Sequence, residues 1–279
     1  MTDLRLKAFS FVDRITSRDQ SGEVLGDFLI PQHAKHFPHA LVAEAIGQLA
    51  AWHSMACLDF QYRPVAALAG DTRFFTQPQP GDVLQLRVGV ESFDEDSISY
   101  HGTAYRSGQP VLALDHYSGA MLPQQDFDDP RRVAEDFATL ISTGAKPARM
   151  ASVPHVLADQ PTLHQNGCIT SGLNVPLEAD FFGDHFPRKP VFPATLLMHA
   201  LSSMLLQGLA SIPALRPAQP TGLRALRRVK MRSWIHPGDQ VLLLAEGYDP
   251  KNPCSRVRLS AFLDNKLVAS AVAEMGHDP

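Results

Sequence analysis

Cysteine is scarce in this chain: three occur among 279 residues, at Cys57, Cys168 and Cys254. Their number is odd and their spacing is wide, which excludes a disulfide framework and the paired spacing of a zinc site. A reducing compartment, the cytoplasm, is therefore the expected location. The first sixteen residues also lack a continuous apolar segment, so we expect no signal peptide.

Charge is modest as well. Charged residues make up 19% of the chain and the formal net charge is −4, so composition gives no reason to expect nucleic acid or a membrane surface as a partner. The most apolar segment is interrupted by His199, Ser202, Ser203 and Gln207, and we expect it to be too polar and too short to span a membrane. Apolar residues reach 44%, which is typical of a globular protein with a sizeable core.

The most distinctive stretch is residues 180–207, where a histidine and two proline clusters precede a long apolar run. Residues 185–193 read HFPRKPVFP. Proline is tolerated at the start of a helix, so Pro193 predicts that a helix begins there. The run that follows is apolar on nearly every side as far as Gly208, which predicts a buried helix.

The sequence predicts the same order of elements in both halves of the chain. A second buried helix is predicted after Pro38, and alternating segments that predict strands follow each helix. The predicted strands are residues 9–15, 22–30, 84–90, 97–105 and 110–121 in the first half, and 167–177, 224–235, 240–247, 255–262 and 266–275 in the second. The polar segment between the halves contains one short helical pattern. The predicted organisation is a domain of residues 1–122, a linker of residues 123–150 and a domain of residues 151–279.

A short motif supports this internal repeat. Pro80-Gly81-Asp82 recurs as Pro237-Gly238-Asp239, 157 residues later and at the same place after its helix. The motif is a good turn in any protein, but its equal placement favours a repeat. A long helix with a run of antiparallel strands, twice over, predicts the α+β class.

The motif at residues 185–193 resembles that of the hot-dog fold 3-hydroxyacyl-acyl carrier protein dehydratases of fatty-acid synthesis. Residues 11–14, FVDR, and 44–48, EAIGQ, are similar to two other motifs of that family. The resemblance covers nearly the whole chain and is most specific in residues 184–193. It implies a double hot dog, in which two antiparallel sheets each wrap around a long central helix. It also implies dehydration of a 3-hydroxyacyl thioester, carried on acyl carrier protein or coenzyme A, without a metal or redox cofactor.

The resemblance also implies where the reaction takes place. In that family the motif histidine faces an acid fourteen positions later, but the residue fourteen positions after His185 is His199. Glu44 stands 155 residues before His199 and takes the acid position in the first half, where Ile30 takes the histidine position. Single-unit relatives pair so that each site receives its histidine from one subunit and its acid from the other. The chain is therefore expected to form one catalytic site from His185 and Glu44, and one inactive site from Ile30 and His199.

Five further residues are predicted to bind substrate: Gln48, Phe192, Pro193, Ala194 and Thr195. Free N–H groups where the second helix begins are suited to the thioester oxygen. Gln48 lies one helical turn after Glu44 and is suited to orienting its carboxylate. Ala194 stands where the family has glycine. This replacement keeps the backbone N–H group, but the added methyl group crowds the approach of the substrate.

These assignments have alternatives. Taken alone, Glu44 also fits a solvent-facing helix acid, and His185 a histidine that fixes a loop. His199 is most simply a core histidine. His36 belongs to a second HFP sequence, but it lies only eight residues before Glu44, so we interpret it as a loop residue. No metal site is expected, because His33, His36 and His39 lack metal-ligand spacing.

One basic cluster stands out from the acidic chain, and it consists of Arg216, Arg224, Arg227, Arg228, Lys230 and Arg232. It fits either a docking surface for an acidic acyl carrier protein or for coenzyme A phosphates, or a solvated strand face. Two other functions remain open: a non-catalytic acyl-binding or partner subunit, and a hot-dog thioesterase. The chain is expected to be its own pseudo-dimer, with further homo-oligomerisation open.

Overall fold

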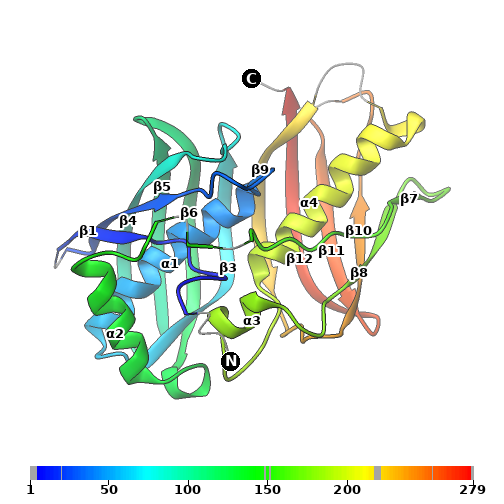
Figure 1. The fold of residues 1–279 in the computed structure, drawn as a ribbon. Helices are drawn as coiled ribbons and strands as arrows, with labels where there is room; N and C mark the ends of the chain where they lie inside the picture. The colour runs from blue at the N-terminus through cyan, green and yellow to red at the C-terminus, as the bar shows by residue number, and fades with distance from the viewer. Residues whose placement is uncertain are drawn as a thin grey trace.

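Residues 5–19, 21–147, 149–150, 152–216, 221–252 and 254–277 are described in the computed structural model of this chain. Their strands form one antiparallel sheet in the order β1-β2-β4-β5-β6-β3-β9-β12-β11-β10-β8-β7 (Figure 1). The strands of the first half are β1 (Arg14–Arg18), β2 (Glu23–Leu29), β3 (Tyr62–Phe74), β4 (Val83–Phe93), β5 (Ser97–Arg106) and β6 (Gln109–Pro123). Those of the second half are β7 (Thr162–Leu163), β8 (Ile169–Asn174), β9 (Thr221–Met231), β10 (Gln240–Glu246), β11 (Arg256–Leu263) and β12 (Lys266–His277).

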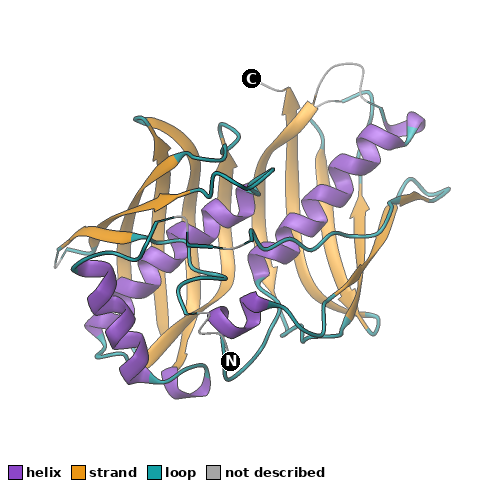
Figure 2. Ribbon diagram, viewed as in Figure 1, coloured by secondary structure: helices purple, strands orange, loops and turns teal. Residues whose placement is uncertain are grey.

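Two long helices lie on the same face of this sheet (Figure 2). Helix α1 (His39–Cys57) packs on the strands of the first half, and α4 (Ala194–Ser211) packs on β8, β9, β10 and β11. Pro38 and Pro193 are the residues immediately before them, both in extended conformation, as the sequence predicts. Each helix buries residues around most of its circumference, which is why the sequence shows little polar face.

The other helices are short. Helix α2 (Pro130–Ile141) occupies the predicted linker, with Asp129 capping its first turn through the Arg131 N–H group. Helix α3 (Asp180–His185) occupies a segment for which the sequence analysis predicts no helix. Two 3₁₀ turns, Gln124–Asp126 and Pro213–Leu215, complete the helical elements of the described residues. The loop that follows α2 crosses in front of both long helices on its way to β7 (Figure 1).

The prediction of two separate sheets is wrong. β3 and β9 pair edge to edge, with Leu68 opposite Lys230 and Asp71 opposite Arg227, and this pairing joins the halves into one sheet. Arg227 forms an ion pair with Asp71 across this seam and another, at 2.7 Å, with Glu274. The domain boundaries, residues 1–122, 123–150 and 151–279, remain predictions.

Strand β3 is absent from the sequence prediction, because its residues do not alternate between apolar and polar types. It begins Tyr62-Arg63-Pro64 and continues through an alanine-rich stretch. The predicted strand at residues 9–15 is also displaced, since β1 begins only at Arg14.

Helix α4 also departs from an expectation. With 18 residues and a mean hydropathy of 1.2, it is long and apolar enough to cross a membrane by length and composition, contrary to the prediction. More than half of it, 56%, is buried within the molecule, as in the core helix of a globular protein. The expectation of no membrane partner stays a prediction.

Candidate active site

His185 is the last residue of α3, just before the loop that leads to α4. Its ring stacks on Phe186, with 3.9 Å between ring centroids, and meets the edge of Phe9 at 4.9 Å. The buried Nδ1 atom has no hydrogen-bond partner among the described residues. Burial, followed by the charge of Arg63, lowers the pKa of His185 to about 3, against a hydrogen bond with the Val191 backbone. The imidazole is therefore neutral at neutral pH.

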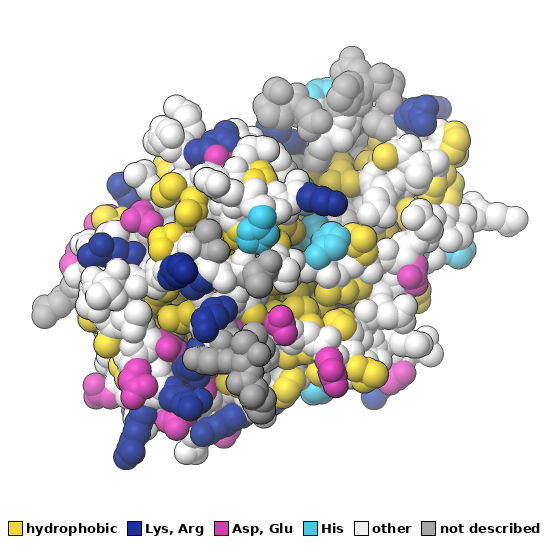
Figure 3. All heavy atoms as spheres, in the orientation of Figure 1, with side chains coloured by type: hydrophobic (Ala, Val, Ile, Leu, Met, Phe, Trp, Pro, Cys, Tyr) yellow, Lys and Arg dark blue, Asp and Glu magenta, His cyan; other side chains and the backbone are white. Residues whose placement is uncertain are grey.

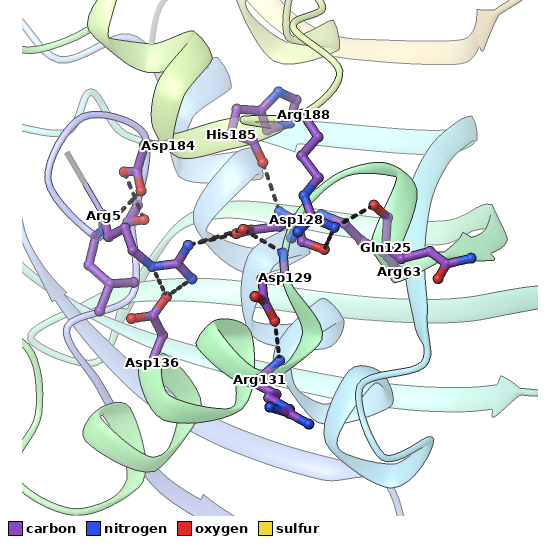
Figure 4. A network of polar contacts seen from close by, with 12 residues as sticks. Arg5, Arg63, Gln125, Asp128, Asp129, Arg131, Asp136, Asp184, His185 and Arg188 are labelled. Carbon is purple, nitrogen blue, oxygen red and sulfur yellow. Dashed lines mark hydrogen bonds and ion pairs between the residues drawn. The ribbon is translucent and has the colours of Figure 1, made fainter. Parts of the chain in front are cut away.

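Hydrogen bonds join the backbone around His185 to residues 5–13, which we call the N-terminal segment (Figure 4). The Asp184 carboxylate accepts hydrogen bonds from the N–H groups of Leu6, Ala8 and Phe9 at 2.7 to 2.9 Å, and from the Ser10 hydroxyl at 3.0 Å. A carboxylate that accepts several N–H groups fixes both segments strongly. The ring of His185 is thus held against Phe9.

Ion pairs and a further hydrogen bond stabilise the same region around α3. Arg5 bonds to Asp128 at 2.9 Å and also to Asp136 of α2 (Figure 4). The guanidinium of Arg188 donates to the Gln125 carbonyl at 2.8 Å. The histidine loop is consequently tied both to the N-terminal segment and to the segment that links the halves.

Glu44 lies on α1, in the other half of the chain. Its carboxylate accepts hydrogen bonds from the Thr195 hydroxyl at 2.7 Å and from the Gln48 amide at 3.1 Å. Burial raises the pKa of Glu44, while these two hydrogen bonds and the charge of Arg63 oppose the shift. A raised pKa favours the protonated carboxyl, the form that is able to donate a proton.

Gln48 connects Glu44 to the segment that holds His185. Its amide donates to the Phe9 carbonyl at 2.8 Å, and its carbonyl accepts from the Phe11 N–H group at 2.8 Å. The side chain is therefore fixed in one orientation, with an amide hydrogen directed at Glu44. The same few residues thus position both candidate catalytic groups.

The two groups line one cavity of about 170 Å³ between the halves. The first half supplies Ala43, Glu44, Gly47, Gln48, Ala51, Arg63, Pro64, Val65, Ile98, Tyr100, Tyr117 and Gly119. The second half supplies His185, Phe186, Val191, Phe192, Ala194, Thr195, Met231, Ser233, Trp234 and Ile235. Of the seven predicted site residues, six line this cavity. The seventh, Pro193, is the residue just before α4 and does not line it.

The beginning of α4 lies at this cavity. No side chain caps the helix, and the Leu197 N–H group donates to the Pro193 carbonyl at 3.1 Å. Helix N-termini carry unsatisfied N–H groups and a partial positive charge. The Ala194 and Thr195 N–H groups are thus placed to bind an oxygen that gains negative charge.

Arg63 is a site residue that the sequence analysis misses. It donates a hydrogen bond to the His185 carbonyl at 2.9 Å, and its guanidinium lies 4.8 Å from the centroid of the Phe186 ring. Burial lowers the pKa of Arg63 to about 10, and nearby carboxylates, Asp128 first, oppose the shift. Nothing in the sequence marks this arginine, because β3 itself is not recognisable.

Two tyrosines of the cavity are also absent from the prediction. Burial raises the pKa of Tyr117 to about 12 and raises that of Tyr100 as well, so both hydroxyls remain protonated. The Tyr100 hydroxyl comes so close to α1 that a Cβ atom at Gly47 would lie 3.0 Å from it. Glycine at this position leaves room for the hydroxyl at the cavity wall.

The predicted inactive pair is not brought together. Ile30 is fully buried in the core of the first half. His199 lines a different cavity with His36 and His39, and burial, followed by the charges of the surrounding histidines, lowers the pKa of His199 to about 4. The Ser202 hydroxyl donates to the Met198 carbonyl at 2.8 Å.

Two observations concern the other predicted surfaces. Among the described residues, no group of three or more His, Cys, Asp or Glu side chains is arranged to hold a metal ion. In the basic cluster Arg227 is engaged in ion pairs, whereas Arg228, Lys230 and Arg232 are exposed. These three exposed cations lie near the end of β9, where the Arg232 guanidinium also donates to the Ser270 hydroxyl at 2.9 Å.

Comparison with known proteins identifies a family model and several dehydratases that are similar to this chain. The model of the ApeI-like family, described as ApeI dehydratase, matches residues 161–270. The 3-hydroxyacyl-[acyl-carrier-protein] dehydratase FabZ of Lactococcus lactis subsp. cremoris (strain SK11) is 31% identical over 127 residues, which cover 43% of this chain and 85% of the relative. FabZ of Streptococcus pneumoniae serotype 19F (strain G54) is 29% identical over 133 residues, covering 46% of this chain and 91% of the relative.

Solved structures with the same fold include thioesterases. A putative oleoyl thioesterase from Lactobacillus plantarum matches with a TM-score of 0.61 at 12% identity, over 93% of this chain and 98% of that one. An acyl-ACP thioesterase from Bacteroides thetaiotaomicron matches with a TM-score of 0.56 at 9% identity, over 93% and 100%. At such identities the likeness concerns the fold, which is of the hot-dog type.

Proposed function

This chain belongs to the hot-dog family of 3-hydroxyacyl-[acyl-carrier-protein] dehydratases, and from that premise we propose that it converts a 3-hydroxyacyl thioester into a 2-enoyl thioester at one composite site. The observation that carries the proposal is the shared cavity. His185 from one half and Glu44 from the other line it together, one neutral and the other with a raised pKa.

The architecture that supports this site is a double hot dog in one chain. Helix α1 with β1 to β6, and α4 with β7 to β12, would each correspond to one hot-dog unit. The β3–β9 pairing stands where two separate subunits would meet. Each half then supplies one catalytic group to a site at their junction.

The first step is removal of the α-proton. Neutral His185 accepts this proton, and the electron pair left on the α-carbon delocalises onto the thioester oxygen. The N–H groups of Ala194 and Thr195 bind that oxygen as its negative charge grows. Burial of the site strengthens these interactions, because water does not screen them.

The second step is loss of the hydroxyl group. Protonated Glu44 gives its proton to the 3-hydroxyl oxygen, the carbon–oxygen bond breaks, and water leaves as the double bond forms. Gln48 and Thr195 hold the carboxyl in place throughout. Atoms and charges balance with these two side chains alone, so the proposal includes no metal or redox cofactor.

The two side chains stabilise one another once they have exchanged protons with the substrate. After the reaction His185 carries a positive charge and Glu44 a negative charge within the same cavity. Opposite charges close together favour the ionised forms, which offsets the desolvation that otherwise disfavours the imidazolium. Transfer of the proton from His185 back to Glu44 through water restores the starting state.

The test is turnover of a 3-hydroxyacyl thioester, or hydration of the 2-enoyl thioester, by the wild type, His185→Ala and Glu44→Gln. We expect each variant to lose activity by about 100-fold or more, because each removes one proton-transfer group. His36→Ala, assayed with a short-chain substrate, is the matched control, since His36 lies in a different cavity. Wild-type activity in Glu44→Gln would show that the acid lies elsewhere.

The same assay separates the alternatives. A thioesterase would release free thiol, and its hydrolysis would survive loss of His185. A partner subunit would be inactive alone with both carrier protein and coenzyme A substrates. We favour acyl carrier protein as the carrier, because the FabZ relatives are named for it and the exposed cations beside β9 would suit its acidic surface. A cytoplasmic location remains part of the proposal.

A further inference from the structure

A second cavity, of about 630 Å³, lies beside the candidate active site. It is lined by His36, His39, Ala40, Phe74, Phe75, Thr76, Gln77, His199, Ser202, Ser203, Leu206, Thr221, Gly222, Leu223, Arg224 and Leu226. Figure 3 shows histidine side chains gathered on the face where the two halves meet. None of the chemistry proposed above uses this cavity.

This second cavity is the counterpart of the first under the internal repeat. His199, Ser202, Ser203 and Leu206 line it from α4, and 155 residues earlier their counterparts Glu44, Gly47, Gln48 and Ala51 line the active cavity from α1. His39 and Ala40 at the start of α1 likewise correspond to Ala194 and Thr195 at the start of α4. The chain has therefore kept the cavity of its second site while replacing the residues that would react.

An apolar crevice lies between the two cavities. It is lined by Ala40, Ala43, Leu68, Thr72, Phe74, Tyr117, Ala194, Thr195, Met198, Leu226, Val229 and Met231, between the two long helices and the β3–β9 seam. Its lining includes Ala43, Thr195 and Met231 of the active cavity. It also includes Ala40, Phe74 and Leu226 of the second cavity. The crevice thus shares walls with both cavities.

The order of residues along α4 gives the direction of this path. Ala194 and Thr195 line the active cavity, Met198 lines the crevice, and Ser202, Ser203 and Leu206 line the second cavity. From Thr195 to Leu206 the helix rises by about 16 Å, at 1.5 Å per residue. An extended alkyl chain that starts at the active cavity has an apolar wall over the first part of this distance.

We propose that the second cavity binds the distal part of the acyl chain whose thioester end lies at His185 and Glu44. The substrate class is then a long-chain 3-hydroxyacyl thioester that extends past Met198. This inference rests on the proposed dehydratase function and specifies its substrate. At the distal end, the imidazoles of His39 and His199, whose pKa values burial lowers, and the hydroxyl of Ser203 provide hydrogen-bonding groups, so a polar group near the end of the acyl chain is accommodated there.

The test compares kcat/KM for a short-chain and a long-chain 2-enoyl thioester in hydration. Ser203→Trp fills the second cavity and is expected to lower the long-to-short ratio about tenfold or more, because several methylene groups lose their buried position. Leu206→Trp repeats the test at an exposed position that tolerates a larger side chain. Ser211→Trp is the matched control, an exposed serine on the same helix outside all three spaces.

A ratio unchanged in both folded cavity variants would overturn the inference. The number of ligands provides a second measurement: calorimetric titration with a long S-alkyl thioether of phosphopantetheine should give one molecule per chain. Two molecules would mean that the second cavity binds its own ligand, which also contradicts the inference. Wild-type activity toward the short substrate tests the dehydratase function separately, so the two proposals fail in different ways.

Discussion

At the scale of single residues, the buried guanidinium of Arg63 influences how both proposed catalytic groups titrate. Burial is the main cause of both pKa shifts; the positive charge of Arg63 adds to the fall in the pKa of His185 and opposes the rise in the pKa of Glu44. It also fixes the His185 carbonyl and covers the Phe186 ring. One residue therefore influences the protonation state and the position of the reacting groups.

Arg63→Met should shift both limbs of the pH profile of kcat/KM toward higher pH. Without the guanidinium the imidazolium of His185 is less disfavoured, so the pKa of His185 rises and the acidic limb moves up. The carboxylate of Glu44 loses a nearby cation, so the pKa of Glu44 rises and the alkaline limb moves the same way. The measurement is the pH dependence of enoyl thioester hydration.

Arg73→Met is the control, because Arg73 lies on the same strand but is exposed and paired with Asp115. It should leave both limbs in place. Arg63→Lys keeps the charge and should restore most of the wild-type profile. Limbs that move in opposite directions in Arg63→Met would contradict this role.

Sequence reasoning located some of these residues and missed others for a physical reason. His185 and Glu44 are found because they belong to short motifs next to helices with a strong apolar pattern. Arg63, Tyr100 and Tyr117 reach the cavity from strands, where alternate side chains face α1. A single arginine or tyrosine on a strand has no local pattern, so its place in the site depends on the tertiary fold.

At the scale of elements, the N-terminal segment hydrogen-bonds to both halves of the site, and we call it the clamp. Asp184 accepts three N–H groups of this segment, and Phe9 and Phe11 bond in turn to Gln48. Gln48 then donates to Glu44. The position of the acid relative to the histidine thus depends on residues that belong to neither catalytic motif.

Asp184→Ala should lower kcat about tenfold to 100-fold, since loss of supporting hydrogen bonds around a reacting group has effects of this size. The segment should also exchange its amide hydrogens faster, because three N–H groups lose their acceptor. Asp180→Ala, an exposed acid of the same short helix, is the control and should change neither quantity. Faster exchange without a fall in kcat would show that the clamp has no part in positioning the site.

The elements themselves were predicted unevenly. Both long helices begin where proline predicts, and the strands with regular alternation, such as β4 and β5, are confirmed. β3 was missed because its residues do not alternate between apolar and polar types. The N-terminal strand was displaced because Leu6, Phe9 and Phe11 hydrogen-bond to Asp184 of α3 and Gln48 of α1. Contacts between distant segments leave no periodic trace in the sequence.

At the scale of the whole molecule, the composite site should be complete within one chain. The β3–β9 seam joins the halves with backbone hydrogen bonds and with the ion pair of Arg227 and Asp71. A mixture of His185→Ala and Glu44→Gln chains should therefore stay inactive. If sites formed between chains, random pairing would restore about a quarter of the wild-type activity.

The measurement is enoyl thioester hydration after the two variants are unfolded together and refolded. The same mixture without unfolding is the control for exchange between folded chains. Recovered activity in the refolded sample would show that halves swap between chains. It would also make the association state of the protein part of its mechanism.

Joining the halves in one chain has a genetic consequence. When a site forms between two identical subunits, every mutation alters both sites, so neither site can lose its chemistry unless the other loses it too. Here the two equivalent helix positions are separate codons, and one encodes Glu44 while the other encodes His199. Under the proposed mechanism, selection on catalysis acts on the first codon alone, and the second is free to be selected for a different purpose.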